Sequence, residues 1–201
     1  MKGLIRKDLY LILKNFRSFL FIAAAFIVFS AFGTSNTFFV IYPMVFAAIV
    51  PVSLLSYDEN SRWSGYCDAL PCTRAQVVSA KYIVALICLS VVFVLSLLAQ
   101  LLRIKLSGGS MEEFIFLMLS LLFMGFAGPA ISLPAIFKLG PEKGRLIYFF
   151  VIGATCALSV LITSDGSILS DLPIPALTAG AAALFVLSWL LSVSFYKKRN
   201  L

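Results

Sequence analysis

Residues 57–82, YDENSRWSGYCDALPCTRAQVVSAKY, form the one long polar stretch between two apolar segments, and the rest of the chain is organised around it. Apolar and aromatic side chains recur in it at i, i+3, i+4 and i+7, at Trp63, Tyr66, Cys67 and Leu70. This spacing predicts a short amphipathic helix with one apolar stripe. Asp58 and Glu59 precede the stripe, where negative charge favours a helix N-terminus.

The same stretch contains a stop signal and a second start signal. Pro71 ends the first helix, because proline lacks an amide hydrogen and disrupts the preceding turn. Thr73 followed three residues later by Gln76 is a capping box, which predicts that a new helix begins here and continues through Lys81 into an apolar segment.

The composition indicates whether this chain lies in water or in a membrane. Of its 201 residues, 61% are hydrophobic and 12% charged, and the mean hydropathy is +1.03, which is typical of a polytopic membrane protein. Spanning helices need roughly 20 apolar residues, and charged side chains are costly within them, so runs without Asp, Glu, Lys or Arg mark candidate spans. We predict an all-α fold with six spans, at residues 18–33, 38–56, 82–102, 114–137, 146–164 and 174–196.

The basic residues predict the orientation. If the N-terminus is cytoplasmic, every Lys and Arg except Arg103 and Lys105 falls in a cytoplasmic segment, as the positive-inside rule requires. Both termini, the 197–201 tail and the polar stretch are then cytoplasmic. The net charge of +7 is explained by contact with anionic lipid, and we expect no nucleic-acid partner.

Residues 2–17 predict a helix that lies in the membrane interface before the first span. Its apolar residues share one face, at Ile5, Leu9, Ile12, Leu13 and Phe16, and its basic residues gather on another. A cleaved signal peptide is the alternative, but the segment has no small-residue cleavage site and a second span follows at once.

The residues that are missing argue against an enzyme. The chain has no histidine and no Walker A motif, so we expect it neither to hydrolyse ATP nor to bind a cofactor or metal itself. The predicted spans hold no Asp, Glu, Lys or Arg, and Gln100 is their most polar long side chain. Ion-coupled carriers usually need an intramembrane ionisable group, so energy for transport would have to come from a partner.

A family resemblance is carried by two segments. Residues 58–82 resemble the part of bacterial ABC-2-type permeases that runs from an acidic residue through an aromatic and a Tyr to Leu-Pro, then Ser/Thr-Arg and Lys-Tyr. The opening MKGLIRKDLYLILK is similar to the start of these permeases, and the layout of the whole chain is similar too. The resemblance includes the branch that exports amphipathic peptide toxins in staphylococci.

This resemblance implies a type V-like half-permease of an ABC exporter. Two permease copies, or this chain and a related permease, would pair around a path for an amphiphilic substrate in the bacterial cytoplasmic membrane. Two copies of a separate ATPase subunit, which carry ATP and Mg²⁺, would bind below. The family's coupling helix would correspond to residues 58–71, and its docking surface to Glu59, Trp63, Tyr66, Leu70, Pro71 and Arg74.

Two other functions remain open at this point. A ligand-capture subunit of a vitamin importer also has six spans and a separate ATPase, but it should show a polar binding pocket on the outer side. A non-transporting sensor partner or assembly factor is the second alternative. Trp63 and Tyr66 would then only anchor the chain at the level of the lipid headgroups.

Overall fold

The computed structural model describes residues 2–15, 17–32, 37–61, 63, 73–107, 111–140, 146–147, 149–150, 153 and 174–198. Within these residues the elements are six helices: α1 (Lys2–Asn15), α2 (Arg17–Phe32), α3 (Thr37–Asn60), α5 (Arg74–Ser107), α6 (Met111–Leu139) and α8 (Ile174–Lys198). The described part of the chain is therefore helical, as the composition predicts.

Four of these helices are long and apolar enough to cross a membrane: Phe39–Asn60, Arg74–Leu106, Phe114–Lys138 and Thr178–Tyr196. They overlap the predicted spans at residues 38–56, 82–102, 114–137 and 174–196. The predicted span at residues 146–164 lies mostly outside the described residues.

The first predicted span, residues 18–33, coincides with α2, which has 16 residues. α2 alone is too short to count among the four candidate spans. α1 and α2 together form a bent pair whose axes differ by 74°. The predicted change of direction after the N-terminal helix is present, although the described part of the chain supports four spans, or five with this pair, and not six.

α5 is much longer than the predicted span at residues 82–102. Its 34 residues correspond to about 50 Å at 1.5 Å per residue, compared with a hydrocarbon core of about 30 Å. The helix continues beyond the apolar run at both ends, and it therefore contains Lys81 as well as Arg103 and Lys105.

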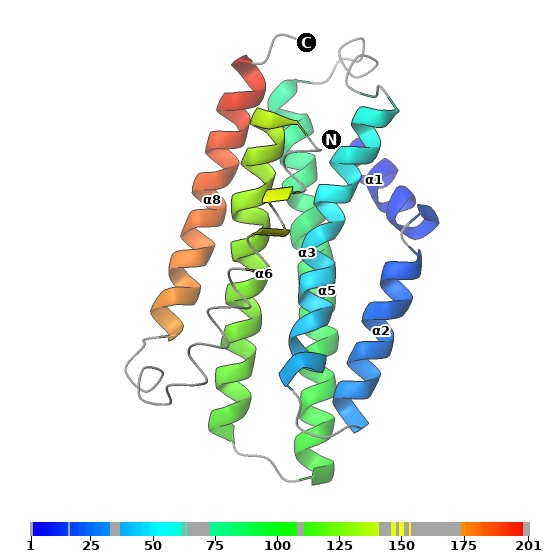
Figure 1. The fold of residues 1–201 in the computed structure, drawn as a ribbon, viewed down its shortest axis with the longest axis vertical. Helices are drawn as coiled ribbons and strands as arrows, with labels where there is room; N and C mark the ends of the chain where they lie inside the picture. Colours follow the sequence, from blue (N-terminus) through cyan, green and yellow to red (C-terminus); the bar gives the residue numbers. More distant parts are fainter. Residues whose placement is uncertain are drawn as a thin grey trace.

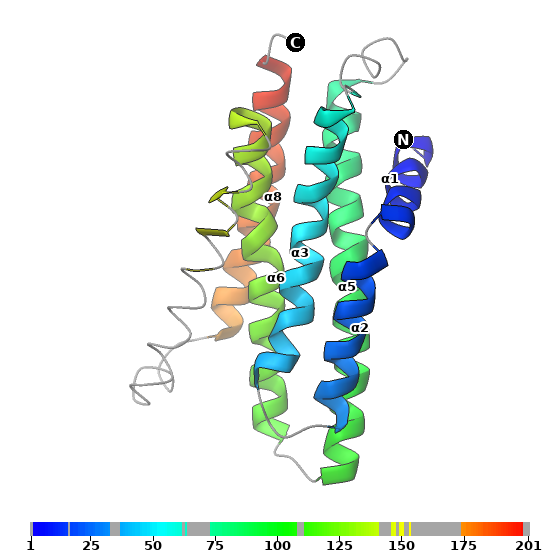
Figure 2. The ribbon, with the colours of Figure 1, turned by 45° about the vertical axis from the view of Figure 1, so that its right-hand side comes forward.

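The helices form one bundle with α3 and α5 at its centre. α3 contacts α2, α5 and α6, while α8 lies along α6 and also contacts α5 (Figure 1 and Figure 2). The main core is built from apolar residues of α3, α5, α6 and α8, among them Val52, Val78, Leu121 and Leu133, all of which are inaccessible to solvent.

Apolar side chains also cover the outside of the bundle. Many large ones are exposed on the outer faces of α2, α5 and α8, for example Phe21, Val94 and Leu187. Such faces are unfavourable in water and are expected for helices that contact lipid. The bundle is thus apolar both inside and outside, which fits a membrane protein.

One end of the bundle collects the segments that the sequence predicts to be polar. α1, the end of α3, the start of α5 and the ends of α6 and α8 all lie there (Figure 1). We call this the α1 end. The opposite end holds the last residues of α2 and α5 and the first of α3 and α6.

Candidate functional site

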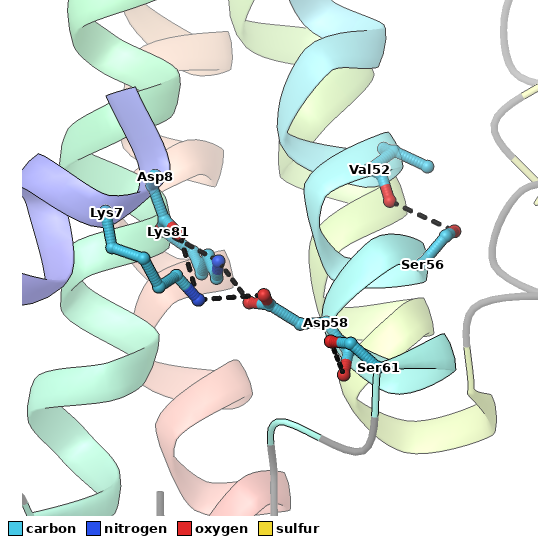
Figure 3. Close-up of polar contacts among 7 residues, drawn as sticks. All are labelled: Lys7, Asp8, Val52, Ser56, Asp58, Ser61 and Lys81. Carbon is cyan, nitrogen blue, oxygen red and sulfur yellow. Dashed lines mark hydrogen bonds and ion pairs between the residues drawn. The ribbon is translucent and has the colours of Figure 1, made fainter. Parts of the chain in front are cut away.

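Four charged residues from three helices form a closed ring at the α1 end (Figure 3). Lys7 Nζ lies 2.8 Å from Asp58 Oδ1 and 3.3 Å from Asp8 Oδ1. Lys81 Nζ lies 2.8 Å from Asp8 Oδ2 and 2.5 Å from Asp58 Oδ2. Each lysine therefore contacts both aspartates, and each aspartate contacts both lysines. We call these four residues the charge ring.

The charge ring is buried and electrically balanced. The side chains of Asp8, Lys81 and Asp58 are 2%, 5% and 13% exposed, and only Lys7, at 24%, reaches solvent appreciably. Removing such charges from water is costly, and the cost is offset only when each charge has good partners. Two positive and two negative groups in alternation meet that requirement.

The ring joins α1 to α3 and α5. Asp8 is on the buried face of α1, between Leu4 and Ile12, at the spacing of four residues that places side chains on one helix face. Ile12 packs with Val50 and Leu54 of α3 and with Val84 of α5. An apolar contact and an ionic contact thus hold the same face of α1 against the bundle.

Trp63 lies next to the ring. The Nζ atom of Lys7 is 4.0 Å from the centroid of the Trp63 ring, within the range of a cation–π interaction. Trp63 is half-buried, and Glu59 is exposed in the last turn of α3. One lysine of α1 therefore contacts both Asp58, at the end of α3, and the aromatic residue at the centre of the predicted docking surface.

The predicted capping box starts α5. The amide of Gln76 donates to Thr73 Oγ1 at 3.3 Å, and the amide of Thr73 donates to Gln76 Oε1 at 3.2 Å. These reciprocal bonds satisfy amides that have no partner within the helix. Arg74 of the predicted docking surface is the first residue of α5 and is half-buried.

Asp58 and Glu59 lie in the last turn of α3, which extends past the predicted span at residues 38–56 to Asn60. The short helix predicted to follow them lies almost wholly outside the described residues. α3 ends just beyond, where the amide of Ser61 donates to the Tyr57 carbonyl and its hydroxyl donates to the Asp58 carbonyl. The physical reason for the extension is that Asp58 pairs with Lys7 and Lys81, so its charge is tolerated at the end of an apolar helix.

The structure describes only part of the predicted docking surface. Glu59 is in the last turn of α3, Arg74 is the first residue of α5, and the Trp63 ring lies against Lys7 of α1, so all three are at the α1 end. Tyr66, Leu70 and Pro71 lie outside the described residues, as does most of the predicted coupling segment at residues 58–71.

The sequence interpretation missed Asp8 and Lys81 as a buried pair. It assigned no role to Asp8, and it placed Lys81 in the helix that continues into an apolar segment. A signal for Asp8 was present, because Leu4, Asp8 and Ile12 fall on one face, where a carboxylate between two apolar residues needs a cation. No local pattern could select Lys81, which is 73 residues away.

The α5–α8 contact contains a second polar group. The Tyr82 hydroxyl lies 2.7 Å from Ser188 Oγ and 2.7 Å from Ser192 Oγ, and all three residues are buried. Trp189 Nε1 also donates to Ser79 Oγ at 3.1 Å. No cluster of three or more His, Cys, Asp or Glu able to hold a metal occurs among the described residues.

Gln100, near the other end of α5, is 3% exposed. Its Oε1 atom accepts a long hydrogen bond of 3.4 Å from Arg103, whereas its Nε2 atom has no partner among the described residues. One turn earlier, the buried hydroxyl of Ser96 also has no partner there. Buried polar atoms usually have a hydrogen-bond partner, and among the described residues the one further exception is Asp8 Oδ1, which lies 3.3 Å from Lys7 Nζ.

One comparison with known proteins identifies the family. The model of the family described as ABC-2 family transporter protein matches residues 3–197, which is nearly the whole chain. No curated protein and no solved structure matches the chain. The match includes α1, all four candidate spans and the polar stretch between α3 and α5. The chain therefore belongs to the ABC-2 family of transporter proteins, and it is a membrane-embedded permease subunit of an ABC transporter, a class of subunit that works with an ABC ATPase.

Proposed function

We propose that the chain is the half-permease of an ATP-driven exporter and that residues 58–71, between α3 and α5, receive the force of ATP hydrolysis. The charge ring is the observation that carries this proposal. Two of its four ion pairs tie Asp58 at the end of α3 to Lys7 of α1 and Lys81 of α5, at 2.8 and 2.5 Å, and a third joins Lys81 to Asp8 of α1 at 2.8 Å. A segment that transmits force must be attached at both ends to helices that are held together and do not move independently.

The ATPase docks on Glu59, Trp63, Tyr66, Leu70, Pro71 and Arg74. The mixture of an apolar stripe with acidic residues favours docking over simple anchoring, because a membrane anchor would more often be basic. The contact of Lys7 with the Trp63 ring further supports this function, since it connects the docking surface to the charge ring.

The assembly contains two permeases and two ATPase subunits. Pairing of two half-permeases, either two copies of this chain or this chain with a related one, supplies the spans that a transport path requires. ATP and Mg²⁺ bind to the ATPase, and the permease itself catalyses no reaction. The lack of a Walker A motif and of histidine in the sequence supports this division of labour.

The transported substrate is amphiphilic, such as a membrane-active peptide, a drug or a lipid-like molecule. Charged side chains in the bundle gather near its ends, whereas the middle is apolar with isolated hydroxyl and amide groups. Such surroundings suit a molecule with a large apolar part better than a sugar or an ion.

The α1 end faces the cytoplasm of a bacterium, and α1 lies along the inner surface of the cytoplasmic membrane. The excess of Lys and Arg in segments at this end supports the orientation. Exposed Tyr10 and Leu13 on α1 would contact the lipid interface, while Leu4, Asp8 and Ile12 face the bundle.

Copurification with the ATPase tests this proposal. The chain is expressed with a candidate ATPase partner, purified in mild detergent and compared with the Trp63→Ala/Tyr66→Ala variant. We expect a stable complex with the unaltered chain and at least a tenfold loss of bound ATPase with the variant, because aromatic residues often dominate binding energy. The control is Tyr10→Ala, which removes an aromatic side chain that is 65% exposed at the same end of the bundle.

Several outcomes contradict the proposal. A double variant that keeps both the ATPase and transport would assign Trp63 and Tyr66 to membrane anchoring. A chain that binds no ATPase at all would leave the sensor or assembly alternatives. Uptake of a ligand from the outer side, with the ATPase bound, would indicate the vitamin-type importer instead.

A further inference from the structure

Two neighbouring residues of α5 contact opposite sides of the bundle. Lys81 belongs to the charge ring and faces α1 and α3, whereas the next residue, Tyr82, faces α8. Consecutive residues of an α-helix point about 100° apart, so a single turn can connect two separate neighbours. The contact of α5 with the charge ring and its contact with α8 therefore lie on the same helical turn.

The Tyr82 hydroxyl is fully used in its contact with α8. It lies 2.7 Å from both Ser188 Oγ and Ser192 Oγ, and Tyr82, Ser188 and Ser192 are 3%, 3% and 0% exposed. A phenol can donate one hydrogen bond and accept another, which matches two serine partners. The serines are four residues apart and thus share one face of α8.

These serines differ from three other serines of the bundle. Ser30, Ser56 and Ser132 donate to a carbonyl three or four residues earlier in their own helix. Ser188 and Ser192 instead bond to another helix at a position 106 and 110 residues away in sequence. In apolar surroundings an interhelical bond of this kind fixes which residues of two helices face each other.

Other contacts reinforce the same level of α5. The Trp189 Nε1 atom donates to Ser79 Oγ at 3.1 Å, and the rings of Tyr82 and Phe185 meet edge to face with centroids 5.2 Å apart. α8 packs mainly along α6, and its hydrogen bonds with Ser79 and Tyr82 connect it to α5, the helix that carries Lys81.

We propose that Tyr82 is a positioning residue that couples α8 to the charge ring, so that displacement of the segment between α3 and α5 moves α8 together with α5. This inference depends on the proposed function and adds a named route through the bundle. It also explains why Lys81 and Tyr82 are adjacent, because the lysine binds aspartates of α1 and α3 and the tyrosine binds serines of α8.

The hydrogen bonds are tested first in the permease alone. Tyr82→Phe removes only the hydroxyl, and Ser188→Ala/Ser192→Ala removes its partners. We expect each variant to lower the melting temperature in detergent and the triple variant to lower it no further than Tyr82→Phe does. Additive losses would show that the bonds between α5 and α8 do not exist in the membrane protein and would overturn the inference.

The coupling is tested in the complex with the ATPase. Spin labels are placed on cysteines at exposed positions 13 of α1 and 190 of α8, in a background in which the four native cysteines are replaced by alanine. With the unaltered Tyr82, we expect ATP to shift the distance between the labels. Tyr82→Phe should abolish this shift and lower the amount transported per ATP by about fivefold or more.

Matched variants separate coupling from packing. Ser132→Ala removes an equally buried hydroxyl that bonds only within α6, and it should keep both the label shift and transport per ATP. Ser188→Thr/Ser192→Thr retains both hydroxyls and should also keep the label shift and transport per ATP. If Tyr82→Phe binds the ATPase and transports as well per ATP as the unaltered chain, the inference is wrong while the proposed function stands. If no ATPase binds the unaltered chain, both are wrong.

Discussion

At the scale of single residues, the chain uses very few polar side chains inside its apolar bundle, and most of them have partners. The hydroxyls of Tyr82 and Ser132 have hydrogen-bond partners within the protein, whereas the Nε2 atom of Gln100 has no partner among the described residues. The sequence singled out Gln100 as the most polar long side chain of the spans. Only the structure shows that its amide is buried and half satisfied.

Replacing Gln100 should therefore stabilise the bundle. Gln100→Leu removes a buried donor without a partner and fills a similar volume, so we expect the free energy of unfolding to rise by about 1 kcal/mol. Thermal unfolding in detergent checks this. The control is Gln76→Leu on the same helix, which removes the side chain of the capping box and should lower stability.

A Gln100→Leu variant that is as destabilised as Gln76→Leu would mean that the Gln100 amide has a strong partner. If the variant is more stable and transports less, the glutamine is retained for transport at the expense of stability.

At the scale of helices, the sequence indicated where helices start and where their apolar segments lie more clearly than where helices end. Thr73 and Gln76 predicted the start of α5 because a capping box is a local pattern, and the structure confirms it. α3 extends beyond the predicted span at residues 38–56 to Asn60, because a helix can continue past an apolar run as long as its charges find partners. The partners of Asp58 come from α1 and α5, and no local pattern contains them.

The charge ring should hold these three helices together in a way that a double-mutant cycle can measure. Asp8→Asn and Lys81→Met each remove one charge and leave the buried ring with an unbalanced charge, and each should cost about 3–5 kcal/mol of unfolding free energy. The two changes combined leave the Lys7–Asp58 pair in a neutral site. We expect the double variant to lose much less than the two single losses added together.

The exposed Lys14 of α1 supplies the control, because Lys14→Met removes a charge outside the ring and should leave stability within about 0.5 kcal/mol. Additivity of the Asp8 and Lys81 losses would show that these two residues do not form a pair.

At the scale of the whole molecule, composition and charge pattern predicted a polytopic helical protein, and the four candidate spans confirm that class. The residues of the candidate site were predicted less completely. Trp63 and Glu59 could be chosen because they lie in one polar stretch, whereas the charge ring depends on residues 7 to 81, which meet only after α1, α3 and α5 have packed. Local sequence patterns predict helices; they do not predict which distant charges will pair.

In the proposed function, force enters the permease at the α1 end, next to the charge ring. If so, the ATPase must lie in contact with residues that follow α3 and must be far from the other end of the bundle. Leu106, which is 68% exposed near the end of α5, marks that other end. Its distance from Lys81 along the helix is about 38 Å at 1.5 Å per residue.

Site-specific photo-crosslinking tests this claim most directly. A photoreactive amino acid is placed at position 63 or at position 106, and the complex with the ATPase is irradiated in membranes. We expect a crosslink between the permease and the ATPase from position 63 and none from position 106. A crosslink from position 106 with none from position 63, in a complex that is otherwise active, would contradict the account.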